Sequence, residues 1–175
     1  MSPFVASCTE ILRRTPSVLR ALLADLPDDW TTATEKRDAW SPHVIVAHLI
    51  QGEDTDWIPR ARLILEHGPN RPFEPFDRHG ELSRIANDPL ARLLDTFGER
   101  RTRNLEILES LQLTEDDLAR EGVHPELGTV TLRNLLATWC AHDLAHQAQM
   151  TRTMARRLAE DVGPWRHPEY MAHFT

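Results

Sequence analysis

The chain has 175 residues, a formal net charge of -7 and 41% hydrophobic residues, which is ordinary for one globular domain. A chain of this length buries a full core without disulfides, and its two cysteines, Cys8 and Cys140, form no disulfide framework. The acidic balance, without any long block of Lys or Arg, argues against a nucleic-acid partner. No signal peptide is evident, and the longest nearly apolar run, HVIVAHLI, is far below the roughly 20 residues that a membrane span needs. We therefore expect a cytoplasmic protein with no membrane partner.

Three pairs of a capping residue and a proline mark expected helix starts. A Ser, Thr or Asp side chain can accept a hydrogen bond from a first-turn N–H. Proline is tolerated at the first helical position because the N–H that it lacks would have no acceptor within the helix. Each pair precedes an apolar stripe at helical spacing. The pairs are Thr15-Pro16, Ser41-Pro42 and Asp88-Pro89.

The first half of the chain predicts two of the main helices. One runs from Pro16 to Leu26, with residues 3–14 as a separate amphipathic helix or a kinked extension of it. The next runs from Pro42 towards Leu65, and Pro59 within it predicts a kink or break. The connection over residues 68–88 is long, polar and rich in Pro and Arg, which is typical of a functional or interface element.

The second half predicts the remaining helices. A helix runs from Pro89 to about Leu108, and Thr114 with the following acidic residues caps a short helical turn. Only the residues around Val123 to Val130 alternate with period two. A last helix runs from Thr131 to about Leu158.

The simplest fold that buries the apolar faces of four main helices is an all-α four-helix bundle with short additional helices. We expect residues 1–160 to form this single domain. Residues 161–175 are expected to be a C-terminal tail that packs on the bundle.

His142 and His146 stand four residues apart in the last predicted helix. This spacing places both imidazoles on one helix face, where their nitrogens can converge on one ion. Such a pair by itself more often reflects two packed core histidines than a metal site, because a four-residue spacing is common by chance. Two buried neutral imidazoles nevertheless need partners.

A third histidine changes this balance. His48 lies on the apolar stripe of the second predicted helix, among aliphatic residues where histidine is least expected. Three histidines on interior faces of one bundle have the ligand count of an open catalytic metal site. The other six are weaker candidates because they lie in a first turn, in loops or in the tail: His43, His67, His79, His124, His167 and His173.

Further polar residues flank the predicted site. Gln149 and Thr138 each lie about one turn from a histidine on the same face and could orient a ligand, although a helix-packing role is equally consistent with the pattern. Asp143 points roughly 100° away from His142 and is a weak candidate for the same ion. The sequence has no HExxH, GxSxG or CxxC motif and no phosphate-binding glycine loop.

The segments AWSPHVIVAHLIQGE, FEPFDR and GTVTLRNLLATWCAHDLAHQAQM resemble the DinB/YfiT-like superfamily. The resemblance implies a four-helix bundle in an up-down-down-up arrangement, often a homodimer. It also implies a divalent metal, usually zinc or nickel, bound by three histidines, which correspond to His48, His142 and His146. The characterised relatives include transferases and isomerases that use low-molecular-weight thiols such as bacillithiol or mycothiol, while many relatives have no known activity.

The leading hypothesis is therefore a metal-dependent thiol S-transferase that acts on an electrophilic small molecule. One alternative is a hydrolase in which the metal activates water. The other is a non-catalytic, stress-related metal-binding dimer. Substrate specificity is expected to lie in residues 68–88 and at the ends of the N-terminal helix.

Overall fold

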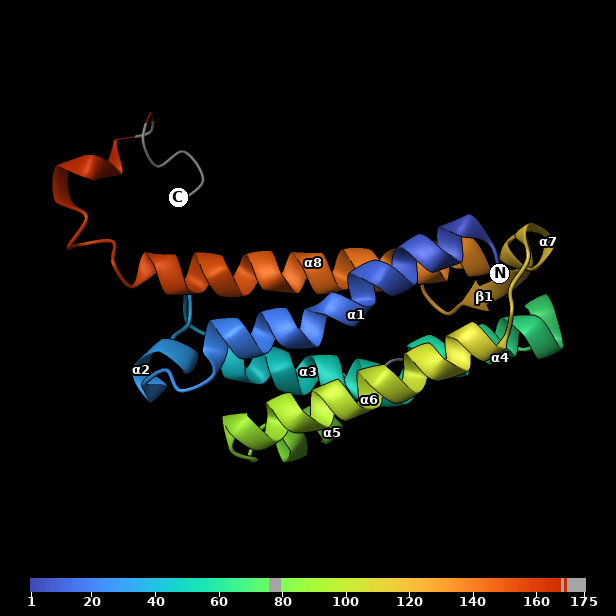
Figure 1. Ribbon diagram of the computed structural model, residues 1–175, viewed down its shortest axis with the longest axis horizontal. Coiled ribbons are helices and arrows are strands. Elements are labelled where there is room, and N and C mark those ends of the chain that lie inside the picture. Colours follow the sequence, from blue (N-terminus) through green and yellow to red (C-terminus); the bar gives the residue numbers. More distant parts are fainter. Residues whose placement is uncertain (76–79, 168, 170–175) are drawn as a thin grey trace.

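The computed structural model describes residues 1–75, 80–167 and 169, and four long helices form its body (Figure 1). The first and last of these helices run in one direction and the middle two in the other, so the up-down-down-up bundle is confirmed (Figure 1). The third long helix packs between the first and second, and the last contacts the first and second. They are α1 (Pro3–Leu23), α3 (Pro42–Thr55), α6 (Leu90–Ser110) and α8 (Leu132–Arg156).

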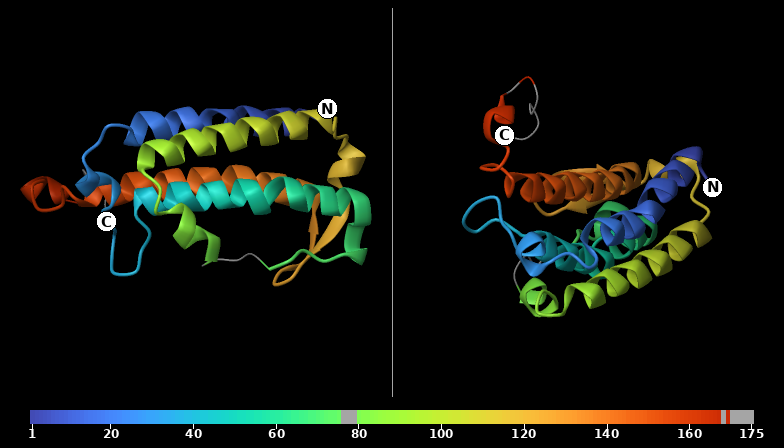
Figure 2. Two further views of the ribbon diagram at one scale, coloured as in Figure 1. Left: turned by 90° about the horizontal axis from the view of Figure 1, so that it is seen from below. Right: turned by 60° about the vertical axis from the view of Figure 1, so that its left-hand side comes forward.

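Short elements connect the long helices. The segment with period-two alternation forms an antiparallel hairpin in which Val123 pairs with Thr129. This hairpin and the helix that follows α3 lie at the same end of the bundle (Figure 2). The short elements are α2 (Asp28–Thr31), α4 (Trp57–His67), η1 (Gly68–Asn70), α5 (Gly80–Ile85), α7 (Glu115–Leu118), β1 (Glu121–His124), β2 (Gly128–Thr131) and η2 (Gly163–Arg166).

The capping residues identify most helix starts correctly, with two exceptions. Ser41 caps α3, and Thr131 caps α8. At the Asp88-Pro89 pair the helix begins one residue later than expected, at Leu90. The predicted start at Thr15-Pro16 is wrong, because α1 begins at Pro3, where Ser2 accepts a hydrogen bond from the backbone of Phe4. Of the two alternatives for residues 3–14, the structure shows an extension of the same helix, which continues through Pro16.

Two prolines inside apolar stripes have different effects on the helices. Pro59 has no N–H for the carbonyl of Thr55, and α3 ends at Thr55, so the predicted break is confirmed. Pro16 leaves the carbonyl of Leu12 without a helical donor in the same way. There the helix continues, because Arg101 Nη1 donates a hydrogen bond to Leu12 O at 2.8 Å.

Buried apolar side chains form two clusters along the bundle. One surrounds Trp57, Leu105 and Trp139, and the other surrounds Leu19 and Phe97. Polar side chains occupy the layer between them on the same helices, and they include Glu53, Arg101, Asp143 and His48, all buried. The bundle is therefore apolar at both ends and polar in the middle.

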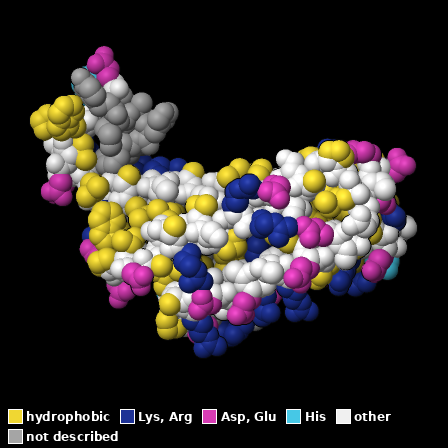
Figure 3. All heavy atoms as spheres, in the orientation of Figure 1, with side chains coloured by type: hydrophobic (Ala, Val, Ile, Leu, Met, Phe, Trp, Pro, Cys, Tyr) yellow, Lys and Arg dark blue, Asp and Glu magenta, His cyan; other side chains and the backbone are white. Residues whose placement is uncertain are grey.

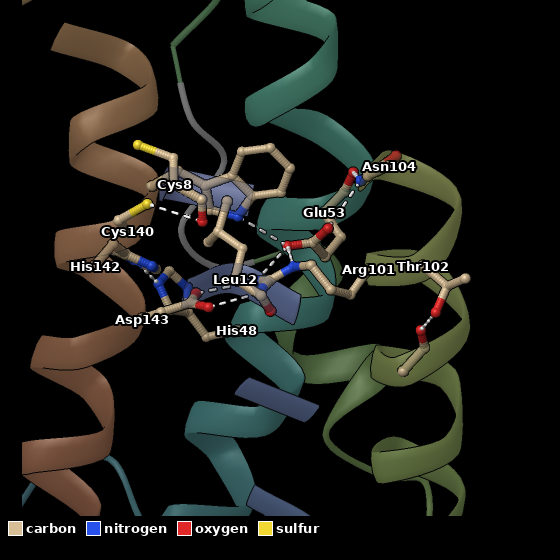
Figure 4. Close-up of polar contacts among 12 residues, drawn as sticks. Cys8, Leu12, His48, Glu53, Arg101, Thr102, Asn104, Cys140, His142 and Asp143 are labelled. Carbon is tan, nitrogen blue, oxygen red and sulfur yellow. Dashed lines mark hydrogen bonds and ion pairs between the residues drawn. The ribbon is translucent and has the colours of Figure 1, made fainter. Parts of the chain in front are cut away.

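Arg101 is the centre of the buried polar layer (Figure 4). Its guanidinium contacts Glu53 Oε1 at 2.7 Å and Asp143 Oδ2 at 2.6 Å, and with Leu12 O these groups engage the five N–H donors of the side chain. Glu53 also accepts hydrogen bonds from Asn104 and from Trp139 Nε1. Burial raises the pKa of Glu53, and Arg101 opposes that shift. Burial disfavours the charge of Arg101, but the two carboxylates outweigh it and raise its pKa.

Acidic and basic side chains are interspersed on the face shown in Figure 3. Ion pairs such as Arg20 with Asp95 and Arg13 with Glu109 join α1 to α6. No helix in the described part of the chain is both long and apolar enough to cross a membrane. Of the predicted tail, residues 168 and 170–175 lie outside those described, and η2 within the described part is exposed.

Replacing Arg101 with Met should destabilise the fold by about 3–5 kcal/mol, because two carboxylates would remain buried without a counter-charge. Urea unfolding followed by circular dichroism measures the change. Arg103→Met, at an exposed position of the same helix, is the matched control and should cost less than about 0.5 kcal/mol. Equal stability of the two variants would show that the buried ion pairs do not support the fold.

Candidate metal centre

Three imidazoles from two helices converge on one point in the polar layer. His48 comes from α3, and His142 and His146 come from successive turns of α8. The Nε2 atom of His142 lies 3.0 Å from that of His48 and 3.2 Å from that of His146. One ligand atom from each ring lies within 4.8 Å of the other two.

The environment disfavours protonation of the two histidines on α8. Burial, reinforced by the neighbouring His146, lowers the pKa of His142 to about 4. Burial likewise lowers the pKa of His146. Neutral imidazoles offer a lone pair to a metal ion, whereas protonated ones repel it.

The surroundings of the three rings set their orientation. His146 Nδ1 lies 3.0 Å from Gln149 Oε1, so the Nδ1–H donates to the amide and the Nε2 lone pair faces the other histidines. The Trp40 ring lies 4.6 Å from that of His48, and the Trp57 ring meets that of His142 edge to face at 5.3 Å. His142 Nδ1 has no hydrogen-bond partner among the described residues.

A pocket of about 420 Å³ opens beside the cluster. His48 and His142 form part of its lining, so a molecule in the pocket has access to the point where the rings converge. Trp40, Trp57 and Phe73 give it apolar walls.

The structure brings together the three histidines that the sequence analysis selected. Thr138 is exposed on the pocket wall, and the structure gives it no contact with a ring of the cluster. Asp143 points to Arg101 rather than into the cluster. Of the histidines considered less suitable, His43 contacts the backbone of Ala86. His79 and His173 lie outside the described residues.

The polar residues of the pocket carry no motif that indicates their role. His124 was expected only as a loop histidine, yet the hairpin places it on the pocket wall together with Asp56 and Arg60 of the α3–α4 region. Its position on the period-two segment, which leads into the last helix, is the only signal that could have indicated this. The residues of the hairpin do not by themselves indicate that it packs on α4.

The donor set suits a divalent transition metal. Three neutral imidazole nitrogens are typical ligands of such ions, and they form an open site when no fourth protein ligand closes it. Among the described residues no cysteine or carboxylate joins the three histidines. His48, His142 and His146 could therefore hold one ion and leave a position for a small ligand.

Comparison with known families agrees with this geometry. The family model described as the DinB superfamily matches residues 11–150. The chain belongs to the DinB superfamily. A solved structure of YfiT from Bacillus subtilis, described as a probable metal-dependent hydrolase with an unusual four-helix bundle topology, superposes on this DinB chain with a TM-score of 0.74. The two are 22% identical over 91% of this chain and 90% of the other. Comparison with curated proteins gives no match.

The geometry predicts about one divalent ion per chain in protein purified without a histidine tag. Elemental analysis should show this stoichiometry, and His142→Ala should abolish it, since that ring lies between the other two. His43→Ala, on the same helix as His48, is the control and should keep the metal. Stoichiometric metal that survives Ala substitution of each of the three histidines in turn would refute the assignment.

Gln149→Ala should weaken metal binding about 10–100-fold, because His146 loses the partner that fixes its ring. Competition with a chromogenic chelator measures the affinity. Gln147→Ala, on the same helix, should leave it unchanged. Equal affinities of the two variants would mean that the Gln149 contact does not orient the ring.

Proposed function

We propose that this chain is a metal-dependent enzyme that joins a low-molecular-weight thiol to an electrophilic small molecule. One observation carries the enzymatic part of the proposal. Three imidazole nitrogens converge beside a pocket, and no fourth ligand from the described residues closes the site. A purely structural metal site is usually closed by four protein ligands.

The resemblance of the sequence to a family with thiol-dependent members supports the choice of a thiol as nucleophile. In the net reaction a thiol R–SH displaces a group X from R′–X, so that a C–S bond forms, the C–X bond breaks and HX is released. A divalent ion that keeps its full charge on three neutral ligands lowers the pKa of a thiol bound to it. Zinc and nickel both accept such ligands.

The residues of the chain would supply position and a dry environment. His48, His142 and His146 would hold the ion, and Gln149 would keep the His146 ring in place. The indoles of Trp40 and Trp57 lie against these rings and exclude water from one side of the site. The pocket volume of about 420 Å³ suits a small molecule rather than a polymer.

Hydrolysis is a second candidate, and the description of YfiT from Bacillus subtilis as a probable metal-dependent hydrolase favours it. The same three histidines would serve, since a bound ion also lowers the pKa of water. We further propose that the protein acts as a homodimer, as the family resemblance implies.

A conjugation assay separates these candidates. Metal-loaded protein is incubated with a panel of thiols and electrophiles, and product formation is followed by mass spectrometry. We expect thiol-dependent turnover that falls by more than about a hundredfold in His146→Ala, because a ligand is lost.

The control variant His43→Ala should retain full turnover in the same assay. Product formation that is independent of thiol would identify the hydrolase instead. Loaded protein without turnover on any substrate would favour a non-catalytic metal-binding protein.

A further inference from the structure

One wall of the pocket carries a rigid arginine. Arg60, on α4, is about 11% exposed, and its Nε lies 2.8 Å from Asp56 Oδ1. Its Nη2 donates to the carbonyl of Glu74, and its guanidinium lies over the Phe73 ring at 5.2 Å. These contacts fix the plane of the guanidinium, and among the described residues they leave its other N–H groups for a molecule in the pocket.

His124 adds a second donor of fixed identity. The backbone N–H groups of Glu126 and Leu127 both point at its Nδ1, at 3.1 and 3.2 Å. Because an N–H can only donate, Nδ1 must carry the lone pair and the ring proton must be on Nε2. The ring lines the pocket and Nδ1 is committed to its own turn, so Nε2–H is the group that can donate to a ligand or to the neighbouring Asp56.

The hairpin is held where it can present this ring. A Cβ at Gly122 would lie 2.7 Å from Ile64 and 3.2 Å from Phe73, so only glycine allows the strand to approach α4 so closely. Phe73 also meets the His124 ring edge to face. Packing on α4 therefore places His124 on the same pocket wall as Arg60.

Asn134 adds a third donor from the first turn of α8. Its Oδ1 accepts hydrogen bonds from the backbone N and the side-chain hydroxyl of Thr131, both at 2.9 Å. This capping contact fixes the orientation of the amide, so the Nδ2 group faces away from the backbone and can only donate. Asn134 is exposed and lines the pocket.

These three donors point to an anionic ligand with several acceptor atoms. Asp56 already balances part of the charge of Arg60, so a ligand with one negative charge suits the wall better than a dianion such as phosphate. The rest of the pocket is mainly apolar, with Trp57, Val130 and Leu135 on its walls. A small organic carboxylate with an apolar body meets both requirements.

We propose that Arg60, His124 and Asn134 bind the carboxylate of the small-molecule substrate, whose apolar body then extends towards the three histidines. The proposal rests on the proposed function, because it names the substrate class of the same pocket. It assigns substrate recognition to α4, the hairpin and the start of α8.

Calorimetric titration with three matched probes tests the assignment: 4-phenylbutanoate, its neutral amide 4-phenylbutanamide, and 3-phenylpropylphosphonate. The carboxylate should bind about tenfold or more tightly than the amide, because it gains charge-assisted hydrogen bonds. It should also bind more tightly than the phosphonate. Equal binding of carboxylate and amide would overturn the proposal, and tighter binding of the phosphonate would replace the carboxylate with a phosphate-like ligand.

Two variants locate the binding. Arg60→Gln should abolish the preference for carboxylate over amide, whereas Arg62→Gln, at an exposed position of the same helix, should keep it. Asn134→Asp keeps the capping oxygen and replaces the amide donor with a negative charge, so it should also abolish the preference without unfolding the chain. Persistence of the preference in folded Asn134→Asp would contradict the role of this wall.

Titrations before and after chelation of the metal separate this proposal from the proposed function. The preference should survive removal of the metal, since the three donors belong to the chain. A preference that is lost with the metal and survives Arg60→Gln would place the carboxylate on the ion and overturn the proposal. Failure of the thiol assay, in contrast, would leave the binding result unchanged.

Discussion

The buried guanidinium of Arg101 is the interaction on which the bundle and the candidate metal centre both depend. It joins Glu53 of α3, Asp143 of α8 and the backbone of α1 from its own position on α6, so all four long helices meet at one charged group. Two buried carboxylates beside one arginine would be costly without close hydrogen bonding, and the contacts of Asn104 and Trp139 with Glu53 supply part of it. The charged groups are paired only when the helices pack in one register. The network therefore prevents the helices from sliding to another register.

That register has consequences for function. Glu53 and Asp143 lie on the same helices as His48 and the His142–His146 pair, and Asp143 directly follows His142 in the chain. Fixing the two carboxylates against Arg101 therefore also fixes the relative positions of the three imidazoles along the bundle axis. The same arginine accommodates Pro16 within α1, because it supplies the donor that the carbonyl of Leu12 lacks. A polar layer between two apolar clusters thus serves both architecture and site geometry.

Local sequence signals predicted the helix caps and the helix break, which depend on interactions between residues close together in the chain. The capping residues Ser41 and Thr131 and the break before Pro59 follow from backbone hydrogen bonding within a few residues. The three histidines were found because polar residues interrupt apolar stripes at helical spacing. The start at Thr15-Pro16 was wrong because a distant arginine compensates for the proline, and the pocket roles of Arg60 and His124 were missed because the hairpin packs on α4 through tertiary contacts. Periodicity and motif therefore did not indicate the contact of Arg101 with Leu12 or the packing of the hairpin on α4.

X-ray absorption spectroscopy of zinc-loaded protein shows whether His48, His142 and His146 bind one divalent ion in an open site. We expect imidazole scattering from three histidines, with Zn–N distances of about 2.0–2.1 Å and a further light-atom ligand from solvent. A sulfur ligand at about 2.3 Å would contradict this expectation, because it would place the ion at a cysteine rather than in the cluster. Scattering from fewer than three imidazoles would contradict the assignment of the ligand set.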